Sequence, residues 1–494
     1  MSGRTSKPTI GAFPDTTVDS PTVPAVLTWF VWSLFATSVS VTVARLWADG
    51  SWAVPGVVAV DGLTVLLWVV VTFFSGVVHS YSRRYMAGSA TENGFFLAAF
   101  GFTLVVMALV AADHVVLFVG LWLAMGLVMA KLVGTVDGWP QARTAARVAR
   151  THFLASTALV GVAVTALWWA TGATTVSGIA AAADGLGGPV WLLAAVALVF
   201  AAMIQSALVP FHGWLLSSMT APTPASALMH AGFVNAGGIL LLRFAPVVTV
   251  DTGLMLAIVA VGATSALLGK LMKSVRADVK SELGCSTVGQ MGFMIMQAGL
   301  GFFGAAITHL VLHGFYKAYQ FLGAGGSLEH TAPDERGRRE TTSADVAVVV
   351  ATGVAGGVLF ALLTGKGTSV DSGLLLVLFV VLTTLHAART LVGRTSLSAA
   401  TRYGAVPAVF LPAIAVYALV YEVISTVLAG LPVVAAPTEL TALHVVVAVV
   451  FLAAYVATEA GAHERSGRLY VALLNASQPA RDTLLTATED YDEY

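Results

Sequence analysis

Three side chains that can exchange protons recur at intervals of four in one stretch of an apolar sequence. The segment HLVLHGFYKAYQ, residues 309–320, contains His309, His313 and Lys317. Residues four apart share one face of an α-helix, and eight residues span ~12 Å along its axis. Histidine titrates near neutral pH, and burial disfavours the charged form of lysine, so both can exchange protons at accessible pH. The spacing predicts a proton-exchanging ladder; the alternative is a stripe that only joins helices by hydrogen bonds.

A second set of polar residues accompanies helix breakers in the segment APTPASALMHAGFVNAGG, residues 221–238. Its two prolines remove backbone donors, and its glycines weaken the helices on either side. Non-helical backbone at membrane depth is tolerated where it lines a protein-enclosed cavity, and it recurs at the ion sites of transporters. We therefore place His230 on a proton or cation path, with His212 upstream and Asn235 as an accessory residue. The alternative for His230 is a hydrogen-bonded contact between helices.

The composition places these residues in a membrane. Of the 494 residues, 57% are hydrophobic and 10% are charged, and the mean hydropathy is +0.86. Runs of about 20 apolar residues, the length that crosses a hydrocarbon core of about 30 Å, recur along the chain. The sequence predicts an all-α polytopic membrane protein of about fourteen transmembrane helices. We expect these spans near residues 23–47, 61–81, 94–112, 114–134, 152–171, 190–219, 223–246, 251–271, 282–300, 301–325, 345–364, 370–391, 405–430 and 440–460.

The basic residues indicate an orientation in the membrane. If both termini lie on one side, the connections on that side hold all of the 25 Lys and Arg residues except Arg45, Arg243, Lys366 and Lys317. Lys317 falls within a predicted span, and the other three lie on the opposite side. The positive-inside rule makes the crowded side the cytoplasm.

The polar stretches divide the chain into three parts. We expect a disordered cytoplasmic N-terminal tail at 1–22, a transmembrane domain at 23–460 and a cytoplasmic C-terminal tail at 461–494. The polar loop at 327–344 and the acidic end of the C-terminal tail are solvated connectors or docking surfaces for a cytoplasmic partner.

Several classes of chemistry lack their sequence signatures. Cys285 is the only cysteine, which excludes an intrachain disulfide, a zinc finger and a cysteine-ligated iron–sulfur cluster. The sequence has no G-x-x-x-x-G-K-[ST] phosphate loop, no zinc-ligand spacing of His and Cys, and no Ser, His and Asp set that suggests a triad. No basic patch interleaved with aromatic residues indicates nucleic-acid binding. We expect a transport protein with no cofactor, no metal and no catalytic site of its own.

Longer motifs carry a resemblance to a known family. The run PFHGWLLSSMTAPTPASALMHAGFVNAGGILLLRF, with VKSELGCSTVGQMGFMIMQAGLG and HLVLHGFYKAYQFLGAGG, resembles the proton-conducting membrane subunits of respiratory complex I and of Mrp-type cation antiporters. The resemblance extends from about Asp61 to Arg394. Within that superfamily, the segments PFHGWL, HAGFVNAGG, FMIMQAGLG and HGFYKAYQFL resemble in particular the DabB family, the membrane subunits of DAB inorganic carbon pumps.

The resemblance implies a fold and a function. It implies two inverted repeats of five helices, each with a discontinuous helix, here near 190–219 and 345–369. It also implies conduction of a cation, H⁺, across the lipid bilayer to energise a cytoplasmic zinc-containing partner, DabA. That partner resembles β-carbonic anhydrases and converts CO2 to bicarbonate. On this interpretation Lys366, beside the second discontinuous helix, is an outer gate of the path.

The sequence departs from the family pattern in its first repeat. The family's Trp-Glu pair falls on Trp122 and Leu123, and its lysine in the first discontinuous helix falls on Gln205. A leucine cannot exchange a proton, and an amide does so only at extreme pH. We therefore expect the path to rely on His230 and on the ladder at 309–317.

Four further charged residues are candidates for accessory roles. Asp113 begins the helix at 114–134, as a cap or as part of an access path. Lys131 lies near the far end of that helix, where we expect it to snorkel to the interface. Lys280 and Glu282 precede another helix, and we expect them to form an ion pair near the inner face.

Two other functions stay open at this point. One is a subunit of an Mrp-type Na⁺/H⁺ antiporter or of a complex I-like NADH-quinone oxidoreductase. The other is a degenerate subunit that only anchors a partner, which Leu123 and Gln205 suggest. The ladder argues against an anchor, because ionisable groups within a span are costly and mark functional sites.

Overall fold

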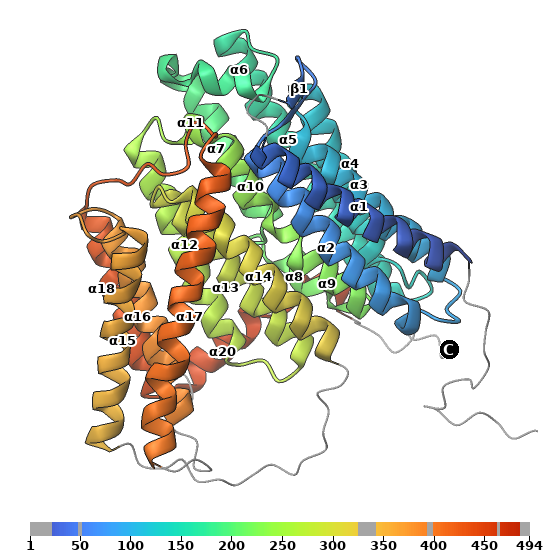
Figure 1. Ribbon diagram of the computed structural model, residues 1–494. Coiled ribbons are helices and arrows are strands. Elements are labelled where there is room, and N and C mark those ends of the chain that lie inside the picture. Colours follow the sequence, from blue (N-terminus) through green and yellow to red (C-terminus); the bar gives the residue numbers. More distant parts are fainter. Residues whose placement is uncertain (1–21, 48–51, 325–341, 393–398, 462–464, 485–494) are drawn as a thin grey trace, which may run out of the picture.

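Long apolar helices run side by side through most of the chain (Figure 1). The computed structural model describes residues 22–47, 52–324, 342–392, 399–461 and 465–484. Within these ranges, twelve helical segments are long and apolar enough to cross a membrane, against the fourteen or so expected. The all-α polytopic membrane fold is thus confirmed. The segments are α1 (Thr22–Trp47), α2 (Gly62–Tyr85), α3 (Glu92–Ala111), α4 (Val115–Val133), α5 (Pro140–Thr171), α7 (Gly188–Gln205), α9 (Thr223–Ala231) with η3 (Phe233–Asn235) and α10 (Ala236–Arg243), α12 (Thr252–Lys273), α15 (Ser343–Thr364), α16 (Gly373–Val392), α17 (Ala399–Leu428) and α18 (Ala442–Glu459).

Two further long helices occupy the centre of the bundle. They are α13 (Val279–Gly299) and α14 (Phe303–Gly323), which coincide with the two remaining predicted spans but are not among the twelve apolar segments. Most of their side chains are buried, so their polar groups are shielded from lipid. α12 packs very closely on α13, because a Cβ atom on Gly269 would lie 2.2 Å from the backbone nitrogen of Gly289. Small residues at such a crossing let two helix backbones approach each other.

The helix predicted at 190–219 ends early. α7 stops at Gln205, and the chain runs through turns from 206 to 212. Pro210 in this connection has no backbone donor. The hydroxyl of Ser206 donates to the carbonyl of Val234 at 2.6 Å, which ties the connection to η3. The connection leads into the short helices α8 (Gly213–Ser217) and η2 (Ser218–Thr220).

A second connection lies between α15 and α16. α15 ends at Thr364 because Gly365 adopts the left-handed conformation, with φ of 67°. Gly367 also has positive φ, and α16 begins at Gly373. The hydroxyl of Ser372 donates to the carbonyl of Leu300 at 2.7 Å, which holds this connection against the turn between α13 and α14.

Short elements that the sequence analysis did not predict cover one end of the bundle, at the top of Figure 1. They are the antiparallel hairpin β1 (Trp52–Val54) and β2 (Val58–Val60), α6 (Val176–Ala181), η1 (Ala183–Gly185) and α11 (Ala245–Val248). At the same end Arg243 of α10 forms a salt bridge with Asp61, the N-cap residue of α2. This pair joins two helices that are far apart in the sequence.

Part of the C-terminal segment packs against the opposite end of the bundle. It forms α20 (Gly467–Ala476) and η5 (Arg481–Thr483), and Leu473 is buried. The backbone nitrogen of Ala480 donates to the hydroxyl of Ser217 in α8 at 3.0 Å. The expected N-terminal tail lies outside the described residues except for Thr22, as do the acidic end of the chain and most of the loop at 327–344.

Candidate functional site

The predicted ladder residues lie on one face of α14. The rings of His309 and His313 stack with centroids 5.8 Å apart and 15° between their planes. One turn further, Lys317 is fully buried, and its ammonium group donates to the carbonyl of Leu283 in α13 at 3.0 Å. Within the described chain no carboxylate forms a salt bridge with it. A buried lysine without a counter-ion destabilises the fold, which indicates a functional reason for its position.

His230 joins this ladder from the neighbouring helix α9. Its ring stacks on Phe321 of α14 with centroids 4.4 Å apart, and its Nδ1 lies 2.8 Å from the hydroxyl of Thr287 in α13. The hydroxyl of Thr287 also lies 2.9 Å from the carbonyl of Leu283, so it has two acceptor positions within reach, this carbonyl and Nδ1 of His230. Because Lys317 donates to the same carbonyl, Leu283 links His230 to the lysine.

Several polar atoms of this cluster are buried without a hydrogen-bond partner in the described chain. They are the Nε2 atoms of His230, His309 and His313 and the Oε1 atom of Gln297. Leaving such an atom unpaired costs about 1–3 kcal/mol, and small polar cavities are where water pairs with such groups. The cluster therefore combines titratable groups with buried polar atoms that no protein group satisfies in the described chain.

Two cavities meet at His309. One has a volume of about 280 Å³ and is lined by Gln297, Tyr417, Tyr421 and Lys366. The other has a volume of about 460 Å³ and is lined by several polar residues that include Lys270, Lys273, Gln290 and His386. Four residues line both cavities: Phe293, His309, Phe379 and Thr383. His309 is the titratable one among these four.

Lys366 lines the smaller cavity. It follows α15 in the connection to α16 and is almost fully buried. Its ammonium group lies 3.2 Å from the centroid of the Tyr421 ring and 5.6 Å from that of Phe302. Aromatic faces attract a desolvated cation, so these rings hold the lysine at the cavity wall. The structure thus brings Lys366 and His309 to one cavity.

His212, Lys280 and Glu282 do not join the ladder. Nε2 of His212 lies 2.9 Å from the carbonyl of Ala476, so this histidine contacts the C-terminal segment. The predicted ion pair between Lys280 and Glu282 is wrong. Lys280 donates to the carbonyl of Ala221 at 2.7 Å, and Glu282 instead pairs with Lys273 at 3.3 Å. Residues two apart on a helix do not face each other, which explains the error.

Asp113 and Lys131 also lie away from the ladder. The expected cap of α4 by Asp113 is wrong, because His114 is the N-cap residue. The carboxylate of Asp113 instead accepts from the backbone nitrogen and the hydroxyl of Ser177 in the first turn of α6, at 2.8 and 2.7 Å. Lys131 is exposed in the last turn of α4, where a long side chain can reach the membrane interface.

Comparison with known proteins places this geometry in a family. Residues 111–342 match the model described as NADH:quinone oxidoreductase/Mrp antiporter, TM. Residues 47–96 match the model of the N-terminus of NADH-ubiquinone oxidoreductase (complex I) chain 5. The chain belongs to the complex I/Mrp antiporter family of membrane subunits.

Within this family, the curated relatives confirm the resemblance to DabB. The chain is 39% identical over 284 residues to the "Probable inorganic carbon transporter subunit DabB1" of Halothiobacillus neapolitanus, which covers 56% of this chain and 50% of that protein. It is 35% identical to the corresponding DabB of Bacillus subtilis, over 54% of this chain and 53% of that protein. NADH-quinone oxidoreductase subunit L of Mycobacterium tuberculosis is 34% identical, over 57% and 44%. The chain therefore spans about half the length of the curated relatives it matches.

Solved structures share the fold of this family member. The Mrp complex from Dietzia sp. aligns with a TM-score of 0.57 and 22% identity, over 92% of this chain and 51% of that chain. A chain of the membrane-bound sulfane sulfur reductase, an archaeal respiratory membrane complex, aligns with a TM-score of 0.57 and 14% identity, over 93% of each chain. At these identities the likeness concerns the fold alone.

The first half of this complex I/Mrp-like subunit holds the positions that depart from the family pattern. Leu123 is half-buried on α4, beside Trp122, whose indole donates to the hydroxyl of Ser156 at 3.1 Å. Gln205 ends α7 and is buried, and its Nε2 has no hydrogen-bond partner in the described part of the chain. Asn235 is also buried in this half, and its Nδ2 donates to the carbonyl of Ala231 at 2.8 Å.

The sequence analysis missed two polar groups in the family member. His79 of α2 is fully buried, and its Nδ1 lies 2.8 Å from the carbonyl of Ser75, one turn earlier. Glu459 accepts from His386, a lining residue of the larger cavity, at 2.8 Å and from Arg389 at 2.9 Å. The signal available in the sequence was a histidine within each of two predicted spans, His79 in 61–81 and His386 in 370–391. No set of three or more His, Cys, Asp or Glu among the described residues is grouped to hold a metal ion.

Proposed function

We propose that this chain is the membrane subunit of an energy-coupled inorganic carbon pump. It conducts a cation, H⁺, that drives a cytoplasmic, zinc-containing, carbonic-anhydrase-like partner of the DabA type, and the partner carries CO2 hydration. The observation that carries the conduction is His309 at the wall of two cavities, because it gives one titratable group access from two sides. The names of the DabB relatives support the substrate.

The path begins at Lys366 and crosses the smaller cavity to His309. The Nε2 atom of His309 accepts the proton and releases it into the larger cavity, towards Lys270 and His386. His313, His230 and Lys317 continue the ladder into the bundle. A positive charge on Lys317 repels a second proton on the histidines, so these groups titrate as a coupled set.

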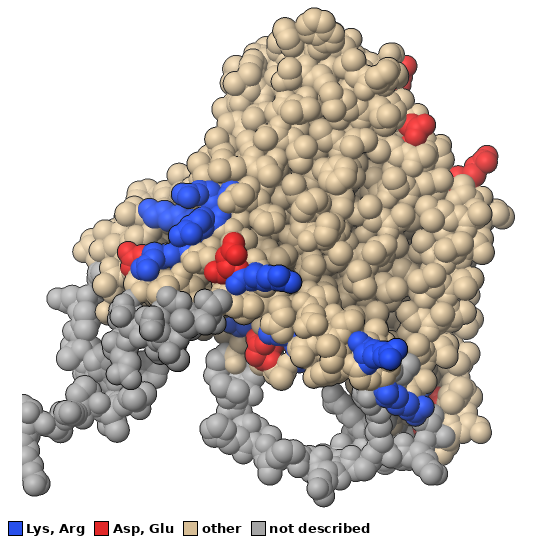
Figure 2. Space-filling model, turned by 180° about the vertical axis from the view of Figure 1, so that it is seen from behind, with Lys and Arg blue, Asp and Glu red and all other residues tan. Residues whose placement is uncertain are grey.

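The larger cavity opens towards the cytoplasm in this proposal. Its basic residues Lys270 and Lys273 lie in the last turn of α12, and Arg389 lies in the last turn of α16. Figure 2 shows Lys and Arg side chains in the middle and lower parts of one face, while the upper part of that face has none. By the positive-inside rule this end faces the cytoplasm, so both termini are cytoplasmic and Lys366 is the outer gate.

Two helices that end in non-helical backbone support the inverted repeats of the family. We assign α7 with α8 as the discontinuous helix of the first repeat, and α15 with the connection at 365–372 as that of the second. Both belong to one transmembrane domain at 23–460. The tails at 1–22 and 461–494 lie on the cytoplasmic side, where the second supplies a surface for the partner.

The proposal is tested by complementation. The chain is co-expressed with the protein encoded beside it in a host that lacks carbonic anhydrase, and growth in air without added CO2 is measured. We expect growth with the native pair and none with Lys317→Ala or His313→Ala, while both variants still assemble with the partner. Lys131→Ala is the matched control, because this lysine is exposed at a helix end. Failure of the native pair despite good expression contradicts the pump, and growth with both ladder variants contradicts the path.

A second candidate is a subunit of a Na⁺/H⁺ antiporter or of a quinone-linked proton pump. The similarity to NADH-quinone oxidoreductase subunit L and the fold shared with the Mrp complex support it. In that case the neighbouring genes encode several small antiporter or dehydrogenase subunits. A large neighbour with a Cys, His and Cys zinc-site pattern instead favours the carbon pump.

A further inference from the structure

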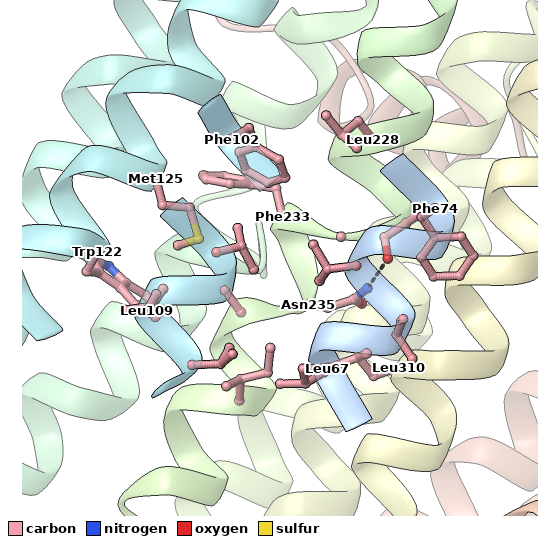
Figure 3. Close-up of a pocket in the computed structure, with 18 of the residues that line it drawn as sticks. Leu67, Phe74, Phe102, Leu109, Trp122, Met125, Leu228, Phe233, Asn235 and Leu310 are labelled. Atoms are coloured by element: carbon pink, nitrogen blue, oxygen red, sulfur yellow. Dashed lines mark hydrogen bonds between the residues drawn. The ribbon is translucent and has the colours of Figure 1, made fainter. Parts of the chain in front are cut away.

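An apolar cavity lies in the first half of the bundle, apart from the two cavities at His309. It has a volume of about 40 Å³ and lies between α2, α3, α4, the α9 to α10 segment and α14. Figure 3 shows Phe102, Met125, Phe233, Leu67 and Leu310 among the side chains that surround it. Nearly all of its lining residues are aliphatic or aromatic.

Only two of the lining residues have strongly polar side chains. Arg243 is engaged at the rim, where its terminal nitrogens contact Asp61 and Thr64. Asn235 is fully buried, and its amide nitrogen donates to the carbonyl of Ala231 (Figure 3). Its Oδ1 atom has no hydrogen-bond partner in the described chain. The site therefore offers an apolar wall and one free acceptor, with no free donor from these two groups.

This wall selects against ions and water. An anion such as bicarbonate would lose its hydration and find no donor to replace it. A stable buried water needs two to four polar partners, and the site offers one. A volume of about 10–15 Å³ holds one water-sized molecule, so 40 Å³ fits a neutral molecule of about three heavy atoms.

CO2 meets these requirements. It is neutral, linear and apolar overall, and its electron-poor carbon can rest against a carbonyl-type oxygen such as Oδ1 of Asn235. We propose that this cavity binds CO2, the uncharged form of inorganic carbon; this rests on the proposed function as a carbon pump subunit. Two of its lining residues, Ala231 and Leu310, are the sequence neighbours of His230 and His309.

The inference is tested by structures of the native complex under CO2 and, separately, xenon pressure. We expect density in the cavity with both gases. Leu109→Trp on α3 fills the cavity and should remove both densities, because Leu109 is a buried lining residue. Leu104→Trp is the matched control on the same helix: Leu104 is 41% exposed and lies outside the cavity, so both densities should remain.

Ordered water in place of gas, or xenon without CO2, overturns the inference. These readouts do not depend on transport, so they separate this inference from the pump proposal. Proton flux into liposomes containing the control Leu104→Trp should stay at the native level, because Leu104 belongs to neither the ladder nor the cavity. If Leu109→Trp does not fold, the gas structures of the native complex still decide the question.

Discussion

The two halves of the bundle share one helical architecture but differ in what lines their interiors. The half from α2 to α10 encloses an apolar cavity of about 40 Å³, and Leu123 and Gln205 stand where the resemblance implies charged residues. The half from α12 to α18 encloses cavities of about 280 and 460 Å³ that meet at His309. The helix scaffold thus tolerates both a dry interior and a polar one.

The difference shows which part of the chain contains buried polar groups that lower the stability of the fold. Lys317 and three histidines carry buried polar atoms in or beside the second half, although unpaired groups of this kind destabilise a fold. His230 belongs to the first half in sequence, yet it contacts Thr287 and Phe321 of the second. Titratable groups therefore gather on one side of the molecule, which is what conduction through one half requires.

Substitutions of two histidines, His309 and His79, separate the halves most strongly. We expect His309→Leu to reduce proton flux by about 10²-fold or more, since a positioned acid–base group contributes that much to proton transfer. His79→Leu should leave flux nearly unchanged, because His79 bonds to Ser75 within its own helix and lies apart from both cavities at His309. Flux is measured with a pH-sensitive dye inside liposomes. Equal losses in both variants would break the distinction between the halves.

A charge placed in the half from α2 to α10 tests whether that half can also conduct protons. Leu123→Glu should lower the free energy of unfolding by about 3 kcal/mol, because a carboxylate within a span lacks a partner there. It should not raise proton flux, since the cavity beside α4 is apolar. Leu123→Gln is the control that keeps the shape without the charge. Increased flux in Leu123→Glu, alone or with Gln205→Lys, would show that the first half conducts once its charge is restored.

The salt bridge between Asp61 and Arg243 predicts a pH dependence of stability. Burial raises the pKa of Asp61, but the charge of Arg243 and hydrogen bonds from Arg243 and Thr64 outweigh it and hold the pKa below 3.8. The carboxylate therefore stabilises the fold fully above its unfolded pKa, and the contribution disappears as pH falls through the lower folded pKa. Asp61→Asn should cost about 3 kcal/mol at neutral pH because it leaves Arg243 unpaired.

Thermal unfolding in detergent, measured from neutral pH to below pH 3.8, checks this dependence. The difference between the native chain and Asp61→Asn should shrink only below that pH. A difference that is constant over the whole range would exclude the ion pair as its source. Lys131→Ala should change stability by no more than about 0.5 kcal/mol, as expected for an exposed side chain.

Local periodicity predicted much of this structure, and long-range packing accounts for the errors. The i, i+4 spacing placed His309, His313 and Lys317 on one face correctly, because helix geometry alone decides that arrangement. The partner of His230 is Thr287, 57 positions away, and no local pattern encodes such a contact. The hairpin at 52–60 was missed although Pro-Gly in its centre is a turn signal.

The central claim is that protons cross this subunit through the second half of the bundle. The most direct test is proton flux into liposomes that contain the complex with its partner, comparing native chain, Lys317→Ala and Lys131→Ala. The account predicts that flux is lost in Lys317→Ala, because Lys317 belongs to the coupled set of titratable groups that includes His309, and kept in Lys131→Ala, where an exposed lysine is removed. Native flux in a correctly assembled Lys317→Ala complex would contradict it.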